Sequence, residues 1–375
     1  MHKAVVAIDC RMLNHSGIGN CIKGLLPHVL ATQTDTRFIL LGKANELSAI
    51  SWASNANVSI EEFDSPLYSI REQIAWRMRT ASHVDLIWVP HINVPYFPTS
   101  RLLVTIHDVI FLRMQSLFGP ATRFYAKIFY QRIRRRANAI HFVSQFTRNE
   151  FYELVGHPTG FSSVIPNGID ESWFHPPKND LAPQNLPDGP FFVFVGNIKP
   201  HKNLRRLISA FKLISQQVPH RLVLVGRKDG FITGDPEIAN LTASLCDRIH
   251  FTGFVSDETL RTIVSRAAFL TFPSLYEGFG LPPLEALAAG VQVLASRIPP
   301  VVETCGSNVT YFDPYDTQDL AEKLLALCAS SKVTPCSLNA ERFRWPTAAS
   351  KVTDLINQTL TSNSPRIKLR NRMPH

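Results

Sequence analysis

Short apolar runs recur along the chain, and helix-length segments separate them. The runs are rich in β-branched and aromatic residues and show little polar alternation, which is typical of parallel strands covered by helices on both faces. The pattern therefore predicts an α/β fold. The predicted strands form two series, which cover 4–8, 38–41, 58–63, 86–89, 102–106, 139–143 and 163–165, and then 191–195, 221–225, 249–251, 269–272, 291–295 and 309–312.

A proline-rich stretch separates the two series. Residues 176–190 hold five prolines and no apolar periodicity, a composition typical of a linker between domains. We therefore predict a first domain over 1–170 and a second over 171–345, each built on a doubly wound sheet, and a final helix over about 347–360. Sheets of this kind bind ligands beyond the carboxyl ends of their strands.

The composition is that of an ordinary globular protein, with 45% hydrophobic and 18% charged residues. No apolar stretch reaches the roughly 20 residues that span a bilayer. The first apolar run meets Asp9 and Arg11 too soon for a signal peptide. The six cysteines form no C-x-x-C pair and no repeated spacing, so we expect neither a zinc site nor a disulfide framework, and we expect a cytoplasmic location.

The formal net charge of +9 is concentrated in the first half of the chain and in the last fifteen residues. Those fifteen residues contain Arg366, Lys368, Arg370 and Arg372 and no acid. This distribution favours an anionic partner, either a lipid headgroup surface or a nucleic acid, although a solubilising surface explains it equally well. No nucleic-acid reading motif accompanies the basic residues, so we expect no nucleic-acid partner.

The segment 124–136 combines bulky apolar residues with five basic ones. At helical spacing, Phe124, Ile128 and Phe129 can share one face, while basic residues within Arg132–Arg136 lie on others. Basic-aromatic helices bind anionic membrane surfaces, and the basic tail favours the same partner. A core helix with a solvated charged face is the alternative.

The segment 273–290 carries the most informative chemistry. It leaves a predicted strand, turns through two glycines, Gly278 and Gly280, and enters an Ala- and Leu-rich helix. Glycines let the backbone approach a ligand closely, and a helix N-terminus binds anions and hydroxyl groups. Glu277 and Glu285 can both face that ligand, because carboxylates accept hydrogen bonds from paired sugar hydroxyls. Capping of the helix by these two residues is the alternative explanation.

This segment resembles the E-x7-E signature of the retaining glycosyltransferase family 4, whose fold is GT-B. Other motifs match the same family in the same order, and the resemblance runs from residue 4 to about 360. The segment 9–13 and the Lys-Pro-His-Lys-Asn form of 199–203 are most similar to bacterial enzymes of O-antigen and exopolysaccharide synthesis, many of them mannosyl- or rhamnosyltransferases that use GDP-sugars. The further matching motifs are 16–20, 105–108, 143–147, 164–170, 194–204 and 253–257.

The resemblance implies two Rossmann-like domains facing across a cleft, with a C-terminal segment, 346–375, that crosses back to the first domain. It implies a nucleotide-diphosphate sugar as donor, a glycan or polyprenyl-diphosphate-linked acceptor, and neither metal nor cofactor. The first domain would be the acceptor side and the second would hold the donor. The implied catalytic residues are His107, Glu277 and Lys202, and the implied donor-binding residues are Gly17, Gly19, Asn197, Lys202, Val255, Gly278, Phe279, Gly280, Leu281 and Glu285.

The resemblance also assigns a role to each group. Glu285 would bind the donor ribose, and Glu277 would contact the donor sugar beside the Gly278–Leu281 backbone. Lys202 would neutralise the diphosphate, with help from the two glycines of 16–20. His107 would lie beside the donor sugar. The residues around Val255 would lie along the base.

The residues themselves support these roles unequally. Lys202 directly precedes a predicted helix, which suits a phosphate-binding cation, although a solubilising lysine is the alternative. Gly17 and Gly19 fit an ordinary strand-to-helix turn, and they form no G-x-G-x-x-G motif, because the next glycine is Gly24. His107 follows a predicted strand at the edge where ligands bind, although a structural His-Asp pair would look the same.

The chain departs from the family at two positions. Asn197 and His201 stand where many members have arginine, so the second charge opposite a diphosphate has no obvious source. Arg205, Arg206 and Arg227 are the candidates to supply it. The chain has no D-x-D motif, which agrees with a metal-independent reaction. Two alternatives remain, a nucleotide-sugar epimerase of the same fold and a non-catalytic sugar-nucleotide-binding partner of a synthase complex.

Overall fold

The computed structural model describes residues 3–80, 84–175, 186–226, 236–245, 247–330 and 340–362. The chain forms two compact units. The first contains Met1–Gly168 and Glu341–His375, and the second contains Ile169–Ala340. This division lies close to the expected domains at 1–170 and 171–345.

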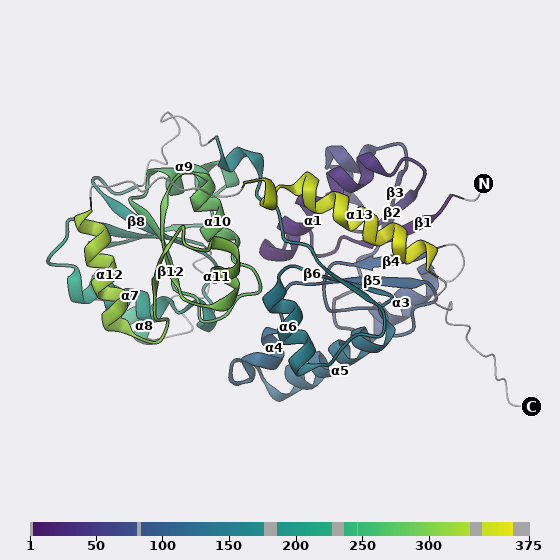
Figure 1. Ribbon diagram of the computed structural model, residues 1–375, viewed down its shortest axis with the longest axis horizontal. Helices are drawn as coiled ribbons and strands as arrows, with labels where there is room; N and C mark the ends of the chain where they lie inside the picture. Colours follow the sequence, from purple (N-terminus) through teal and green to yellow (C-terminus); the bar gives the residue numbers. More distant parts are fainter. Residues whose placement is uncertain are drawn as a thin grey trace, which may run out of the picture. The chain divides into compact units, whose positions relative to one another are not determined.

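The first unit is built on a parallel seven-stranded sheet with the order β3-β2-β1-β4-β5-β6-β7 (Figure 1). Its strands are β1 (Val5–Asp9), β2 (Arg37–Gly42), β3 (Val58–Glu62), β4 (Leu86–Val89), β5 (Arg101–Ile106), β6 (Ala139–Phe142) and β7 (Phe161–Val164). Its helices are α1 (Ser16–Thr32), α2 (Ala44–Ser48), α3 (Ile70–Thr80), α4 (Ile110–Arg113), α5 (Pro120–Arg136), α6 (Gln145–Leu154) and α13 (Trp345–Thr361).

Both faces of this sheet are buried. Successive side chains of a strand point to opposite faces, so Ile8 of β1 packs into one core with α1 and α13. Its neighbour Ala7 packs into the other core, with Trp76 of α3 and Phe129 of α5. This double burial explains why central strands such as β4 have apolar residues at every position, whereas the outer strands β3 and β7 contain Ser or Glu.

The C-terminal helix α13 belongs to the first unit and lies along α1 (Figure 1). Its first residue, Trp345, packs into the core beside Gly24 of α1. A side chain at Gly24 would overlap the Trp345 indole, and a side chain at Gly168 would meet the same residue. The predicted return of the C-terminal helix to the first domain is therefore confirmed, and Gly24 has a packing role.

The second unit is built on a parallel six-stranded sheet with the order β10-β9-β8-β11-β12-β13. Its strands are β8 (Phe191–Val195), β9 (Arg221–Val225), β10 (Ile249–Gly253), β11 (Phe269–Phe272), β12 (Gln292–Ser296) and β13 (Thr310–Phe312). Its helices are α7 (Leu204–Ile214), α8 (Pro236–Ala243), α9 (Asp257–Arg266), α10 (Leu281–Ala288), α11 (Pro299–Cys305) and α12 (Thr317–Ala329). The predicted α/β architecture of two doubly wound sheets is confirmed.

Each sheet has a switch point, where the strand order changes direction. In the first sheet it lies between β1 and β4, and in the second it lies between β8 and β11. Loops that leave the carboxyl ends of these two neighbours turn to opposite faces of the sheet and leave a crevice, which is where open α/β sheets bind ligands. We therefore expect a ligand near the loops that follow β1 and β4 in the first unit, and near those that follow β8 and β11 in the second.

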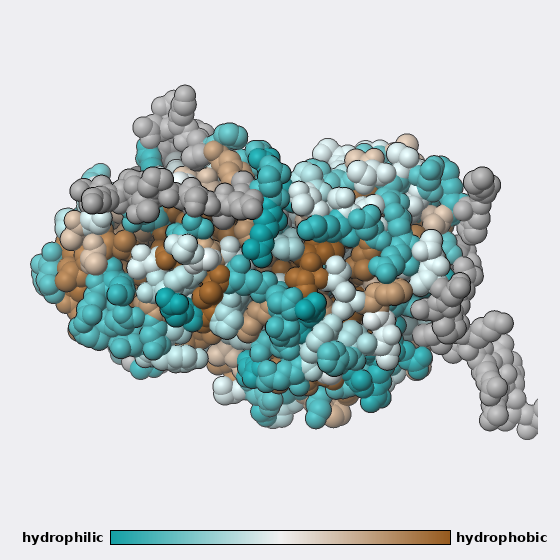
Figure 2. All heavy atoms as spheres, in the orientation of Figure 1, coloured by the Kyte–Doolittle hydropathy of each residue, from teal (hydrophilic) through white to brown (hydrophobic). Residues whose placement is uncertain are grey.

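Within the described residues, no helix is both long and apolar enough to cross a bilayer. On the face shown in Figure 2, apolar and polar residues are interspersed over both units. The segment predicted to bind membranes is α5, in which Phe124 is 68% exposed but Phe129 is buried. Phe129 therefore does not share an exposed face with Phe124, because it packs into the sheet. The basic residues of the C-terminal tail lie outside the described residues.

Candidate active site

The candidate site of the second unit lies at its switch point. After β8 the chain forms a turn of 3-10 helix, Pro200–Lys202, and enters α7, and after β11 it turns into α10. The backbone N–H of Leu275 donates a hydrogen bond to the carbonyl oxygen of His201 over 2.7 Å. This bond holds the two loops together at the edge where a ligand is expected.

The central contact joins two of the predicted site residues. The Lys202 Nζ lies 2.5 Å from the Glu277 Oε1, and the two side chains are 17% and 15% exposed. The ammonium also lies 5.6 Å from the centre of the Phe272 ring. A cation and a carboxylate are thus paired in a largely shielded position, where their charges are screened less than on an open surface.

The glycine turn before α10 contains one left-handed residue. Gly280 has φ +96°, a left-handed conformation that favours glycine, and it begins α10 without a side-chain cap. Pro282 and Pro283 in the first turn have no N–H group. The backbone donors at this helix end are therefore those of the preceding loop, Gly278–Leu281, which is the segment assigned to the sugar and phosphate.

Glu285 lies one turn into α10 in an acidic environment. Burial raises the pKa of its carboxyl to about 7, and Asp257 and Asp170 add to the effect, while Arg261 opposes it. The carboxyl therefore changes its charge near neutral pH. In its ionised form it can accept hydrogen bonds from two neighbouring hydroxyls of a ligand.

The positive charge at this site does not come from His201. Burial and the adjacent Lys202 lower the pKa of the His201 imidazole to about 4, so the ring is neutral at pH 7. Arg206 donates to the Pro314 carbonyl oxygen, and its Nε lies 3.3 Å from the Thr317 Oγ1, which ties α7 to the loop before α12.

The remaining predicted positions of this unit are less informative. Asn197 and Arg205 are exposed. Arg227 lies outside the described residues. Val255 is half-buried and follows β10 beside Phe254, which is 77% exposed, at the same edge of the sheet as the lysine and the glycine turn.

In the first unit, His107 follows β5 at the carboxyl edge. Its Nε2 lies 3.0 Å from the Pro90 carbonyl oxygen, which only accepts, so Nε2 carries the proton and Nδ1 is an acceptor. Burial and the nearby His141 lower the pKa of the ring to about 4. The next residue, Asp108, accepts from the Ile110 N–H at the start of α4.

The two predicted glycines of this unit have different roles. A side chain at Gly19 would overlap the carbonyl of Leu13, so glycine is needed there for close packing. Gly17 faces open space. The N-cap of α1, His15, gives no side-chain cap, and the first turn contains no acid. The start of α1 can therefore receive an anion at Gly17, whereas Gly19 has a structural explanation.

A buried polar network at the first switch point was not predicted from the sequence. Asp9 ends β1, and its carboxylate accepts from the Arg11 Nε over 2.8 Å and from the His91 Nε2 over 2.9 Å. The Arg11 NH1 lies 2.6 Å from the Glu72 Oε1. Burial alone would raise the pKa of the Asp9 carboxyl, but His91 and Arg11 outweigh it and hold the pKa well below its usual range.

The network continues through Asn93 to α5. Asn93 donates to Glu72 over 2.6 Å and accepts from the hydroxyl of Tyr125. The carboxylates of Asp9 and Glu72 are both fully buried. The Arg11 guanidinium lies 4.1 Å from the centre of the Phe63 ring. The only local signal is a polar residue at or just after two apolar runs, Asp9 at the end of β1 and His91 after β4. It does not indicate that these side chains meet.

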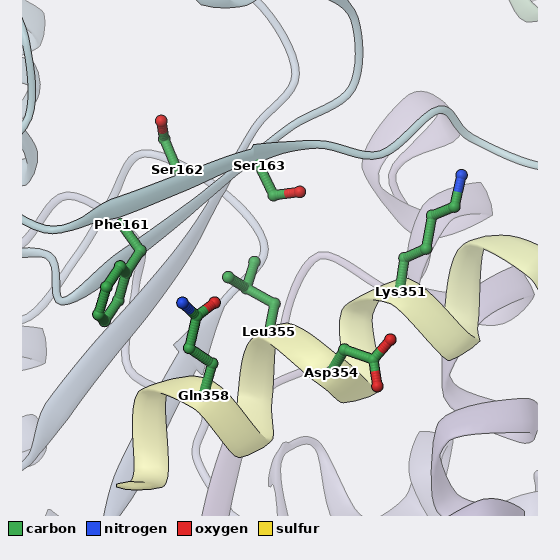
Figure 3. Close-up of a pocket in the computed structure, with 7 residues that line it drawn as sticks. All are labelled: Phe161, Ser162, Ser163, Lys351, Asp354, Leu355 and Gln358. Carbon is green, nitrogen blue, oxygen red and sulfur yellow. The ribbon is translucent and has the colours of Figure 1, made fainter. Parts of the chain in front are cut away.

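The structure also has a cavity of about 320 Å³ between β7 and α13. Figure 3 shows residues from both elements around it. It contains none of the predicted site residues. Its lining consists of Phe161, Ser162, Ser163, Lys351, Asp354, Leu355 and Gln358. Elsewhere in the described part of the chain, no three or more His, Cys, Asp or Glu side chains are grouped to hold a metal ion.

Each of the two units matches a model of a known glycosyltransferase family. A family model described as glycosyl transferases group 1 matches residues 178–340, and one described as Glycosyltransferase Family 4 matches residues 58–173. The chain is 29% identical to the serotype-specific mannosyltransferase WbdA of Escherichia coli, over 73% of this chain and 35% of that protein. It therefore spans about a third of WbdA. It is 28% identical to the O-antigen chain mannosyltransferase B of Escherichia coli, over 67% of each.

Solved structures show the same fold. Sucrose-phosphate synthase from Thermosynechococcus elongatus superposes with a TM-score of 0.76 at 21% identity, over 95% of this chain and 98% of that one. Anabaena HepE in complex with UDP and glucose superposes with a TM-score of 0.70 at 17% identity, over 95% and 100%. These similarities and the two doubly wound sheets show the GT-B fold. The two family models, which match residues 58–173 and 178–340, show that the chain belongs to glycosyltransferase family 4.

Proposed function

We propose that the chain is a retaining hexosyltransferase that moves mannose or rhamnose from a GDP-linked donor to a glycan or polyprenyl-diphosphate-linked acceptor in cell-surface polysaccharide synthesis. The observation that carries the proposal is the contact between Lys202 and Glu277 at the second switch point, beside the glycine start of α10. The relatives named mannosyltransferases support the sugar, and the fold neighbour that holds UDP and glucose supports a nucleotide-sugar donor.

Lys202 is the group that neutralises the departing diphosphate. Its ammonium has three protons, and the bond to Glu277 uses one, so a phosphate oxygen can be bound beside the carboxylate. Charge that develops on the leaving group is stabilised further by the backbone donors of Gly278–Leu281. Glu277 is then placed to accept from a donor-sugar hydroxyl, and Glu285 from the ribose.

The acceptor hydroxyl attacks on the face from which the diphosphate departs, and the diphosphate takes its proton. This route gives retention without a protein base and needs no metal ion. It also fits His107, because an imidazole with a pKa of about 4 is a weak base, and its Nδ1 can accept a hydrogen bond from a hydroxyl without removing the proton.

Donor identity is tested by thermal shift with GDP, UDP, dTDP and ADP. A ligand at 100 times its dissociation constant stabilises by about 2.7 kcal/mol, and GDP is expected to give the largest shift. A larger shift with UDP would overturn the GDP assignment alone. If no diphosphate shifted the melting temperature, the proposal of a donor site in the second unit would be contradicted.

Reaction type is tested with the preferred GDP-sugar and a lipid-linked acceptor, with and without a chelator. The expected product keeps the anomeric configuration of the donor by NMR, and the chelator leaves the rate unchanged. An epimerised donor formed without acceptor would instead identify an epimerase. Loss of the rate with chelator, and its return with added divalent cation, would overturn metal independence.

We also propose that the enzyme acts at the inner face of the membrane, in peripheral contact with anionic lipid. The exposed side chains of Lys127, Arg135 and Arg136 on α5 support this contact. Arg132 lies instead over the Tyr96 ring at 3.8 Å, and Arg134 bonds to Gln131 over 3.0 Å. Fewer basic groups of Arg132–Arg136 are thus available to lipid than the sequence predicts.

A further inference from the structure

Helix α3 presents two different faces. Its inner face carries Glu72 and Trp76, which are 0% and 1% exposed. Its outer face carries Ile70, Ile74 and Met78, which are 83%, 57% and 78% exposed. Large apolar side chains are common on protein surfaces when single, but contiguous groups mark binding surfaces. We call these three residues the α3 stripe.

The stripe is continuous along the helix and is flanked by cations. Residues four apart in an α-helix lie on one face, so Ile70, Ile74 and Met78 form a single row over more than two turns. At 3.6 residues per turn, Arg71 and Arg77 fall on the two sides of that row. Both arginines are exposed.

Helix α3 is fixed beside α5. The Asn93 amide bonds to Glu72 of α3 and accepts from the hydroxyl of Tyr125 of α5. The ring of Tyr68, which precedes α3, meets the Tyr125 ring edge-on at 5.1 Å between centres. Phe124 of α5 is exposed, so α5 adds an aromatic group to the same side of the sheet.

Among the described residues of α3 and α5, the exposed charged side chains are all basic. The sequence of α5 contains six basic residues and no acid. The only acid in the sequence of α3 is Glu72, which is buried and paired with Arg11. The acids that precede α3, Glu61, Glu62 and Asp64, lie on β3 and the turn after it. An occupant of this surface must therefore be apolar at its centre and anionic at its edges.

We propose that the α3 stripe docks the first unit onto an anionic lipid bilayer, with its three apolar side chains at the acyl boundary and Arg71 and Arg77 at the lipid phosphates. A second copy of the chain fits less well. A two-fold contact through the stripe would bring Arg71 and Arg77 toward the same residues of the other copy, without an acid between them. The inference deepens the membrane contact proposed above, because it names a surface on α3 that the sequence did not reveal.

The test uses the full chain and sedimentation with phosphatidylcholine vesicles that contain phosphatidylglycerol. A triple variant, Ile70→Ser, Ile74→Ser and Met78→Ser, is expected to weaken partitioning at least tenfold, because the apolar contact is lost. Arg71→Gln and Arg77→Gln are each expected to weaken it roughly fivefold and to reduce its dependence on salt. The matched control is Leu213→Ser with Val302→Ser, at exposed apolar positions of the second unit, and it should bind as the native chain does.

A second measurement locates the contact on the native chain. Hydrogen exchange should slow over 70–80 when vesicles are added, and it should stay unchanged over α7. Unchanged partitioning of the triple variant would overturn the inference, and if Arg135→Gln and Arg136→Gln then abolished binding, the contact would belong to α5 alone. Dimerisation that the triple variant abolishes, without vesicle binding by the native chain, would assign the stripe to self-association. No donor is present in these assays, so their failure leaves the transferase proposal standing.

Discussion

The two switch points of this chain have the same topology but opposite chemistry. Between β1 and β4, Asp9 and Glu72 are fully buried, and their partners are Arg11, His91 and Asn93 of the same unit. Between β8 and β11, the ion pair of Lys202 and Glu277 lies within reach of solvent. A parallel sheet thus provides a crevice in both units, and the side chains decide whether it is filled or left for a ligand.

The two switch points differ in how many of their hydrogen-bond donors and acceptors are already satisfied within the chain. Glu72 accepts from Arg11, from the Asn93 amide and from the Tyr68 N–H, so its oxygens are satisfied internally. A fully satisfied buried network makes a fold rigid and specific. Lys202 keeps donors beyond the one used by Glu277, which suits exchange with a phosphate. We therefore expect substitutions at the first switch point to affect stability and those at the second to affect binding and turnover.

The largest effect is expected for Arg11→Met. This change leaves Asp9 and Glu72 buried without their cation, and removal of one partner from a buried pair destabilises by about 3–5 kcal/mol. Urea unfolding followed by tryptophan fluorescence measures it, because four of the five tryptophans belong to the first unit. Arg37→Met, at an exposed position of the first unit, is the control and should change stability by less than about 0.5 kcal/mol. Equal losses in the two variants would contradict the network's role.

Lys202→Ala should reduce turnover strongly and stability little, the opposite of Arg11→Met. Removal of a group that stabilises developing charge lowers kcat by about 10²–10³-fold, whereas the midpoint of unfolding should move little because both partners are partly solvated. Lys212→Ala, at an exposed position of the adjacent helix α7, is the matched control. A variant with unimpaired turnover would show that Lys202 is a structural partner of Glu277 only.

The contrast between the two sites also explains what the sequence could predict. All thirteen strands were predicted within two residues of their ends, because most are buried and largely apolar. The outer strands β3 and β7 are only partly buried and contain Ser or Glu. Lys202 and Glu277 were predicted through motifs, but not their contact, because 75 positions separate them. Only the sheet order, which places β11 beside β8, brings the two loops together.

Two other features follow from tertiary structure alone. Charged residues are usually solvated, so nothing in the local sequence indicates that Asp9, Arg11 and Glu72 share a buried network. The spacing of Ile70, Ile74 and Met78 resembles a core-facing helix row, yet α3 buries the opposite face through Glu72 and Trp76. Helical periodicity shows that these three residues share a side, and only packing decides which side faces the sheet.

The pH dependence of stability tests whether Glu285 of the second site lacks a cation partner in the folded chain. Below its ordinary pKa of 4.5 the carboxyl is protonated in folded and unfolded chains, so Glu285→Gln should not change stability there. Between pH 4.5 and about 7 the unfolded chain ionises this carboxyl while the folded chain keeps it protonated, so the native chain loses stability over that range and the variant does not. At pH 8 the variant should therefore be more stable, by about 2 kcal/mol after allowance for partial exposure.

Donor affinity should change with pH in the reverse direction. The ionised Glu285 accepts from two ribose hydroxyls, so the affinity of the native chain for GDP should rise from pH 6 to pH 8. The same titration of the Glu285→Gln variant is the control, because the ionisation of the ligand's own phosphate is common to both chains. Parallel curves in calorimetry would mean that Glu285 does not contact the ribose.

The smallest effect is expected for His201→Arg. The native imidazole is neutral at pH 7, since burial and Lys202 lower its pKa to about 4, so the substitution adds a full charge beside the predicted diphosphate. Repulsion from Lys202 opposes part of the gain, and we expect GDP to bind about threefold to fivefold tighter, which corresponds to about 1 kcal/mol. His201→Gln separates charge from size and should bind as the native chain does between pH 6 and 8. If the arginine variant bound no tighter, the second phosphate charge would already be offset by backbone donors of the Gly278–Leu281 loop, and the departure from the family at this position would need no compensating cation.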